Sequence, residues 1–267
     1  MMDQHRSDEA HDYAHETVLI LTPVKDAVRH LDRYWDRLTR LTYPPERISL
    51  GLLEGDSADT TYERIHEHLG TLRKRYASVG LWQKSFGLRI PEGMPRWEPA
   101  FQIPRRKALA RARNHLLFRA LADQDWVLWL DVDVAEYPPD LLQMLIGTGR
   151  SIVHPHCVER PGGRSFDRNA WREQGRVHME DLRGGADLVR LDSVGGTVLL
   201  VRADIHRDGL VFPPYPYGRE HPNMRRPGPW GPQIMGEIET EGLALMAADM
   251  GHQCWGMPNL EVVHATD

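Results

Sequence analysis

Two acids one residue apart, Asp131 and Asp133, have the types and spacing that most directly suggest chemistry. They follow Trp126–Leu130, an apolar run typical of a strand that is buried on both faces. Alternate residues of an extended segment point to the same side, so both carboxylates can face one ligand. Carboxylate oxygens suit Mg²⁺ or Mn²⁺. The pair is therefore a candidate cation site, although acids also end many strands simply because strand ends are solvated.

Arginines gather in the segment just before this strand, at Arg105, Arg106, Arg111 and Arg113. Arginine offers forked donors to phosphate oxygens, so a bound divalent ion together with nearby arginines would hold a diphosphate. An exposed helix face is the alternative explanation of such a charged cluster.

Four other polar residues are weaker candidates. Asp56 follows a predicted strand and could accept hydrogen bonds from a nucleoside, or simply form a turn. Glu239 and Glu241 open the last predicted helix, where the helix dipole favours carboxylates in any protein. His264 carries an imidazole that Mn²⁺ accepts beside carboxylates, but a histidine near a terminus indicates little by itself. The sequence has no Walker loop, Gly-x-Ser-x-Gly elbow or dinucleotide fingerprint, so ATPase, hydrolase and dehydrogenase functions lack support.

Strands and helices alternate in the pattern of apolar residues, which predicts an α/β fold with a parallel sheet and right-handed crossovers. The predicted strands are 17–22, 48–53, 79–85, 126–130, 151–156, 195–201 and 260–264. The predicted helices are 28–41, 57–76, 105–123, 138–146 and 237–250. In such sheets ligands bind beyond the carboxyl ends of the strands, where Asp56, Asp131 and Asp133 are expected to lie.

Long loops separate some of these elements. Residues 86–104 are rich in Pro and Gly, and 157–191 form a polar excursion expected to pass over the active edge. Residues 212–232 contain seven prolines, which is too many for regular structure and is typical of a lid or binding loop.

Composition narrows the class of protein. With 267 residues, 41% hydrophobic and 27% charged, residues 17–267 are expected to form one globular domain after a disordered tail at 1–16. The net charge of −5 does not favour nucleic acid, and no apolar segment is long enough for a membrane span or signal peptide. The two cysteines are far apart in sequence, which favours a reducing compartment. A cytoplasmic protein is therefore expected, and self-association into a homo-oligomer is left open.

Taken together, several segments resemble the fungal Golgi mannosyltransferases of glycosyltransferase family 62, the mannan polymerase group. The resemblance lies in LTPVKDA (21–27), LTYPPERISLGLLEGDSADT (41–60), RRKALARARNHLL (105–117), WVLWLDVDVAEYPPDLL (126–142), DSVGGTVLLVRADIHR (192–207) and ETEGLALMAADMGHQCWGMPNLEVVH (239–264). These segments cover nearly the whole chain after residue 17, in the same order.

The resemblance implies a GT-A fold with a mixed sheet flanked by helices, a nucleoside-diphosphate sugar donor, typically GDP-mannose, Mn²⁺ (or Mg²⁺), and transfer with retention to a glycan or small-molecule acceptor. It implies that Asp131, Asp133 and His264 bind the metal, and that Arg111 approaches the diphosphate. The nucleoside pocket and its surroundings would include Thr22, Pro23, Lys25, Asp56, Arg106 and Asn114. Asp131 would also bind the cofactor. Glu239 and Glu241 would face the acceptor or the reacting sugar.

Fungal members carry a membrane anchor, and none is expected from this sequence, so a Golgi location and a mannan acceptor are not transferred to it. The leading hypothesis is a metal-dependent retaining glycosyltransferase. The alternative is a nucleotide-sugar or carbohydrate-binding subunit of low activity. A hydrolase with paired carboxylates ranks last, because Asp131 and Asp133 are too close in sequence to flank a glycosidic bond from two sides.

Overall fold

The central apolar run forms strand β4 (Trp126–Leu130), and all five of its residues are buried. Leu128 and Leu130 enter one hydrophobic core, whereas Val127 and Trp129 enter another on the opposite face. Both faces of the strand are therefore covered, as a run without polar residues requires. These features belong to a computed structural model that describes residues 15–88, 98–218, 227–228, 231–232 and 236–265.

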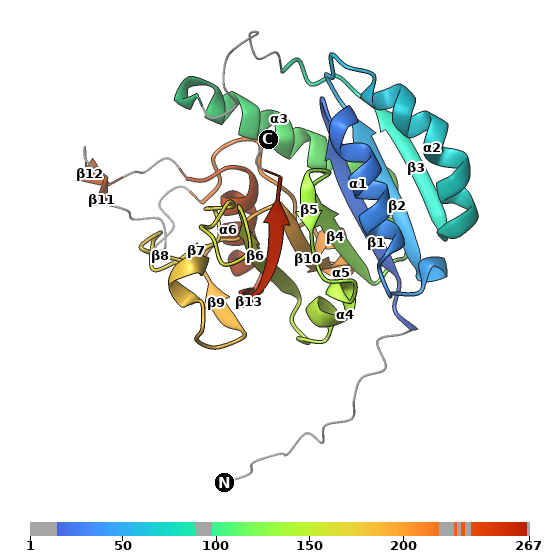
Figure 1. The fold of residues 1–267 in the computed structure, drawn as a ribbon. Coiled ribbons are helices and arrows are strands. Elements are labelled where there is room, and N and C mark those ends of the chain that lie inside the picture. The colour runs from blue at the N-terminus through green and yellow to red at the C-terminus, as the bar shows by residue number, and fades with distance from the viewer. Residues whose placement is uncertain (1–14, 89–97, 219–226, 229–230, 233–235, 266–267) are drawn as a thin grey trace.

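Strand β4 lies in a mixed sheet of nine strands (Figure 1). The other strands are β1 (Val18–Val24), β2 (Ile48–Glu54), β3 (Ser78–Gln83), β5 (Val134–Glu136), β6 (Ile152–Val158), β9 (Val189–Leu191), β10 (Val198–Arg202) and β13 (Cys254–His264). Their order is β3-β2-β1-β4-β10-β6-β13-β5, and β9 pairs with β13. The first four strands of this order are parallel, as predicted, whereas β10 runs antiparallel to β4 and β6.

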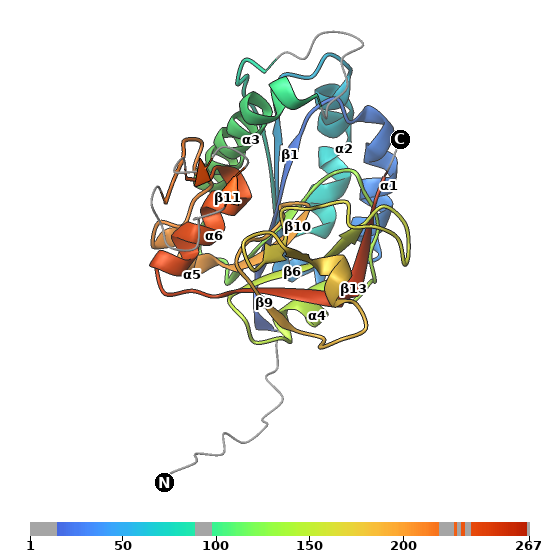
Figure 2. The ribbon, with the colours of Figure 1, turned by 90° about the vertical axis from the view of Figure 1, so that its left-hand side faces the viewer.

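Helices cover both faces of the sheet (Figure 2). The helices are α1 (Val28–Thr39), α2 (Thr61–Arg75), α3 (Pro99–Ala120), α4 (Leu141–Ile146), α5 (Ala203–Arg207) and α6 (Glu239–Asp249). The apolar residues of α1, α2 and α4 share a core with Leu128, whereas those of α3, α5 and α6 share the core of Trp129. Figure 2 accordingly shows α3, α5 and α6 on one side of β1, with α1 and α2 on the other.

Some element boundaries differ from the predicted ones. Helix α3 begins at Pro99 rather than Arg105 and continues through Pro104, which lies so near the start that few helical hydrogen bonds are lost. Strand β13 begins at Cys254 rather than Leu260, because β6 and β9 supply hydrogen-bond partners to residues with no strand pattern of their own.

The polar excursion at 157–191 contains more regular structure than predicted. Besides β9, it holds the two-stranded hairpin β7 (Trp171–Arg172) and β8 (Val177–His178) and the short 3₁₀ helix η3 (Met179–Leu182). In the proline-rich loop, β11 (Pro227–Gly228) pairs with β12 (Gly231–Pro232). Residues 219–226 and 229–230 of that loop, and all but the last two residues of the predicted tail, lie outside the described residues.

The last strand brings the end of the chain to the carboxyl edge of the sheet. In the pairing of β13 with β5, His264 lies opposite Val134. The backbone amide of Ala265 donates to the carbonyl of Asp133 at 2.9 Å. His264 and Val134, 130 residues apart in sequence, are thus held side by side in the sheet.

Candidate functional site

A pocket of about 720 Å³ opens at the carboxyl edge of the sheet, beside the ends of β1, β2 and β4. Asp131 and Asp133 line it together with residues from the loops after β1, β2 and β3 and from the inward side of α3. The lining residues are Pro23, Val24, Lys25, Asp26, Leu53, Gly55, Asp56, Ser57, Ala58, Phe86, Leu88, Arg105, Ala108, Leu109, Ala112, Asp131, Val132 and Asp133. The volume is within the range of pockets that enclose small molecules and cofactors.

Asp133 is held by His264. The Nε2 atom of His264 lies 3.1 Å from Oδ1 of Asp133, and the imidazole ring stacks on Phe166 with 3.5 Å between the ring centroids. Burial opposes a charge on each partner, but their mutual hydrogen bond and attraction outweigh it. The pKa of His264 is therefore raised and that of Asp133 lowered.

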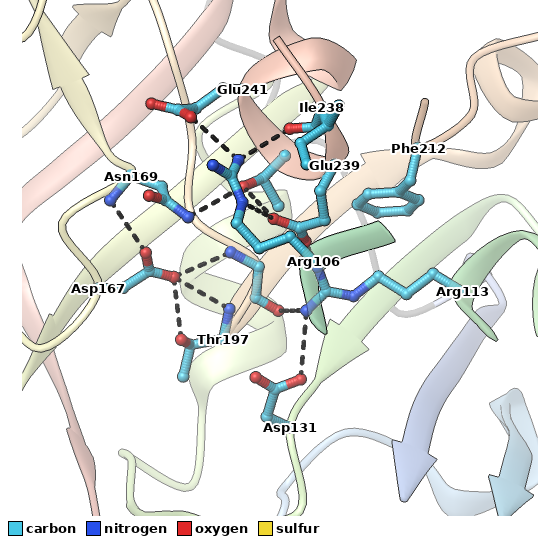
Figure 3. Close-up of polar contacts among 12 residues, drawn as sticks. Arg106, Arg113, Asp131, Asp167, Asn169, Thr197, Phe212, Ile238, Glu239 and Glu241 are labelled. Atoms are coloured by element: carbon cyan, nitrogen blue, oxygen red, sulfur yellow. Dashed lines mark hydrogen bonds and ion pairs between the residues drawn. The ribbon is translucent and has the colours of Figure 1, made fainter. Parts of the chain in front are cut away.

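Asp131 points the other way, toward α3 (Figure 3). Its Oδ1 atom lies 3.4 Å from Nη2 of Arg113. Burial raises the pKa of Asp131 to about 7, Arg113 opposes that rise, and the nearby charge of Asp133 adds to it. The two acids of the Asp-Val-Asp motif are thus tied to different parts of the chain.

Arg113 also joins Asp131 to the start of α6. Its Nη1 atom forms an ion pair with Glu239, and the side chains of both residues are almost fully buried, at 2% and 4% exposure. A second arginine, Arg106, lies 2.9 Å from Glu241 and 3.7 Å from Glu239 (Figure 3). Trp171 Nε1 donates to Glu241 at 3.1 Å. Both acids named from the sequence are therefore committed to buried ionic contacts with α3.

Asp56 organises the wall of the pocket. Its carboxylate accepts hydrogen bonds from the hydroxyl of Ser85 and from the backbone amides of Phe86, Gly87 and Leu88. Burial would raise the pKa of Asp56, but these hydrogen bonds lower it. Lys25, which also lines the pocket, donates to the backbone carbonyl of Asp56 and lies 3.0 Å from Asp26.

Seven sequence-predicted residues lie outside the pocket lining: Arg106, Glu239, Glu241 and His264, whose contacts are given above, and Thr22, Asn114 and Arg111. Thr22 is buried beneath it, where its hydroxyl donates to Leu130 O at 2.8 Å. Asn114 clamps the backbone of Phe212, donating to its carbonyl at 2.7 Å and accepting from its amide at 2.9 Å. Arg111 is exposed and lies 5.6 Å above the ring of Phe86, a residue of the pocket lining, and its approach to a diphosphate stays a prediction.

Arg113 is the residue that sequence reasoning did not single out. The buried positions of α3 include Ala110, Leu116 and Leu117, and Arg113 shares their helical stripe. That three- and four-residue spacing was available in the sequence. Because an arginine is seldom fully buried, the basic residues of this segment suggested phosphate contacts or an exposed helix face, but not a buried ion pair.

Asp131 and Asp133 in the pocket lining, and His264 beside Asp133, have side chains of the types that bind divalent cations. In the unliganded chain His264 Nε2 and Asp133 Oδ1 share a hydrogen bond at 3.1 Å, which a bound ion would replace. Carboxylate and imidazole are ligands that Mn²⁺ accepts. Within the described ranges, however, no three His, Cys, Asp or Glu side chains converge on one point as a ready-made metal site.

A family model described as Anp1 matches residues 1–183 and 173–216. The chain belongs to the Anp1 family. The mannan polymerase complex subunit MNN9 of Candida albicans is 31% identical over 93% of this chain and 74% of its own length. The mannan polymerase II complex anp1 subunit of Schizosaccharomyces pombe is 29% identical. The alignment covers 93% of this chain and 64% of that relative's length. The predicted resemblance to the mannan polymerase group is confirmed.

Solved structures confirm the GT-A fold of this Anp1 family member. The mannosyltransferase PcManGT from Pyrobaculum calidifontis, in complex with GDP-Man and Mn²⁺, aligns with a TM-score of 0.59 at 16% identity, over 94% of this chain and 57% of that one. GalNAc-T7 with UDP, GalNAc and Mn²⁺ aligns with a TM-score of 0.57 at 16% identity, over 94% of this chain and 44% of that one. Among the helices that the structure describes, none is both long and apolar enough to cross a membrane.

Proposed function

We propose that this chain is a retaining glycosyltransferase that transfers mannose from GDP-mannose to a glycan or small-molecule acceptor, with Mn²⁺ bound at Asp133, His264 and Asp131. Residues 17–267 would act as one catalytic domain. The observation that carries the proposal is the pocket at the sheet edge, whose lining contains both acids of the Asp-Val-Asp motif. Cytoplasmic residence stays a prediction of the sequence.

The pocket lining contains groups that suit each part of a nucleoside-diphosphate sugar. Pro23, Phe86 and Leu88 offer apolar surface for a nucleoside. Lys25 and Arg105 carry positive charge for phosphate oxygens, and Asp131 and Asp133 would hold the metal.

The chemistry of the transfer requires neutralisation of charge on the departing diphosphate. Bound Mn²⁺ would supply most of it as a Lewis acid. The chain's own contribution is to hold the ligands in place: Arg113 orients Asp131, and the pairing of β13 with β5 brings His264 beside Asp133. Glu239 and Glu241 pair with Arg113 and Arg106 outside the lining of this pocket, and contact of either acid with the acceptor or the reacting sugar remains a prediction.

A binding subunit of low activity is the second candidate. The relatives from Candida albicans and Schizosaccharomyces pombe are both named as subunits of mannan polymerase complexes. A subunit can keep the fold and the pocket while another chain performs the transfer.

Calorimetry with GDP-mannose, UDP-glucose and UDP-N-acetylglucosamine, each with and without Mn²⁺, tests the donor and the metal. We expect GDP-mannose to bind best and to require Mn²⁺ for binding. In Asp133→Ala, addition of Mn²⁺ should no longer strengthen the binding of GDP-mannose. The matched control is Asp140→Ala, which removes a carboxylate outside the pocket. Binding that is independent of Mn²⁺, or unchanged in Asp133→Ala, would rule out the metal site.

Donor turnover separates the two candidates. A transferase should release free GDP slowly with water as the acceptor and faster with mannose or a short mannoside. Tight binding of GDP-mannose and Mn²⁺ without release of GDP, with any of these acceptors, would favour the binding subunit.

A further inference from the structure

The paired glycines before β10, Gly195 and Gly196, are squeezed between two side chains. A methyl group added at Gly195 would lie 2.0 Å from a carboxylate oxygen of Asp167, and one added at Gly196 would lie 2.3 Å from Nη1 of Arg113. Only glycine at these two positions leaves room for the side chains of Asp167 and Arg113 to contact the backbone. The pair therefore marks a place where two distant segments close on one turn.

Asp167 holds this turn from one side (Figure 3). Its Oδ2 atom accepts hydrogen bonds from the amide of Gly196 at 2.9 Å, the amide of Thr197 at 3.3 Å and the hydroxyl of Thr197 at 2.9 Å. Its Oδ1 atom accepts from the amide of Asn169 at 3.1 Å. All these groups are donors, so an ionised carboxylate satisfies them fully.

The carbonyl groups of Gly196 and Thr197 accept hydrogen bonds from two residues of the candidate site. Gly196 O accepts from Arg113 Nη2 at 3.0 Å, and Thr197 O accepts from the backbone amide of Asp131 at 2.9 Å. Gly196 and Thr197 thus each donate an amide hydrogen bond to Asp167 and accept a carbonyl hydrogen bond from a residue of the site. Movement of the turn would displace Arg113 and Asp131 together.

We propose that Asp167 is a positioning residue, which locks the Gly195–Thr197 turn and through it sets the positions of Arg113 and Asp131 for transfer. The inference rests on the proposed function for its effect on turnover, but the lock itself is a property of the unliganded chain. The proposal also assigns a structural role to the polar excursion at 157–191, which its sequence did not indicate. A side chain of this segment, Asp167, fixes the backbone that contacts Arg113 and Asp131.

Amide hydrogen exchange on the full chain without ligand tests the lock directly. We expect Asp167→Ala to raise exchange at Gly196 and Thr197 by about tenfold or more, because several charge-assisted hydrogen bonds are lost. Asp167→Asn keeps one oxygen for the three converging donors, so its exchange should stay near that of the natural protein. The control Asp187→Ala removes an exposed carboxylate of the same excursion, bonded to Asn259, and should change neither amide.

Turnover of GDP-mannose with Mn²⁺ should follow the same order. We expect kcat to fall about 10- to 100-fold in Asp167→Ala, the usual effect of losing an outer-shell partner, and to recover largely in Asp167→Asn. Unchanged exchange in Asp167→Ala would overturn the lock. Normal exchange with abolished turnover in Asp167→Asn would also overturn the proposal, because Asp167 would then act on the reacting atoms. If the natural protein turns over no donor, the proposed function fails, and the exchange rates alone decide whether Asp167 holds the turn.

Discussion

Arg113 and Arg111 are two residues apart on α3 and have opposite environments. Arg113 is buried between Glu239, Asp131 and the carbonyl of Gly196, whereas Arg111 is exposed over Phe86. A buried ion pair of this kind is tolerated in the folded state only when each charge has a partner, because an unpaired charge in the interior destabilises the fold. The two arginines therefore provide a matched comparison.

We expect Arg113→Met to destabilise the fold by about 3–5 kcal/mol, since it leaves the carboxylate of Glu239 buried without its main partner. Arg111→Met should change stability by no more than about 0.5 kcal/mol, as is usual for exposed positions. Urea denaturation of the two variants measures both effects. Equal losses of stability would contradict the assigned burial of Arg113.

His206 predicts a dependence of stability on pH. Its ring is buried against Trp129, whose Nε1 lies 3.3 Å from Nε2 of His206, and Nδ1 bonds to Leu210 O at 2.7 Å. Burial lowers the pKa of His206 from 6.5 to about 4, so between these values the unfolded chain binds a proton that the folded chain does not. This contribution is fully present above pH 6.5 and is lost as the pH falls toward 4.

The loss attributable to His206 should approach about 3 kcal/mol across that window. Urea unfolding between pH 4 and 8, compared with a His206→Asn variant that cannot titrate, isolates it. The variant should be less stable at pH 7, and the difference should shrink as the pH falls. Parallel curves would show that folding does not lower the pKa of His206.

At the scale of elements, β13 is the strand that completes the site. Its first half pairs with β6 and β9, and its last residues pair with β5, directly after the Asp-Val-Asp motif. Most of the strand is therefore anchored independently of its final residue. The stability of the sheet and the presence of His264 can be separated by experiment.

We expect deletion of residues 264–267 to abolish Mn²⁺-dependent turnover while the sheet stays folded, because the pairing of Val263 with Glu136 is retained. Thermal unfolding and circular dichroism report the fold, and GDP release reports activity. Deletion of residues 266–267 alone is the control and should preserve activity. A protein lacking His264 that keeps full activity with Mn²⁺ would remove this residue from the proposed metal site.

At the scale of the whole molecule, the pocket joins loops after three strands to one helix. A ligand that binds the folded chain only must stabilise all of these segments together. At a free ligand concentration 100 times its Kd, the gain is about 2.7 kcal/mol.

GDP-mannose with Mn²⁺ should therefore raise the unfolding temperature, and chelation of the metal by EDTA should cancel most of the rise. Differential scanning calorimetry of the natural protein and of Asp133→Ala measures the effect. The variant should respond equally with and without EDTA. A rise that survives EDTA in the natural protein would mean that the donor binds without the metal.

Much of the fold could be predicted because the relevant patterns are local. Strands β1, β2, β4 and β10 are apolar runs buried on both faces, and α1 shows one apolar stripe. Strand β5, strand β9 and the first half of β13 were not predicted, since three-residue strands and interrupted runs carry no periodic signal. Their partners, far away in sequence, decide that they are strands at all.

The candidate site divides in the same way. The sequence by itself determined the family, the GT-A fold and the position of Asp131 and Asp133 at the end of a buried strand. Only the tertiary structure decided that Arg113 rather than Arg111 contacts Asp131, and that Asp167 braces the turn beneath it. A helix residue's environment depends on how the helix is rotated against the sheet, and a loop residue's contacts depend on where the loop returns. Both are set by packing between distant segments, which no local pattern in a sequence records.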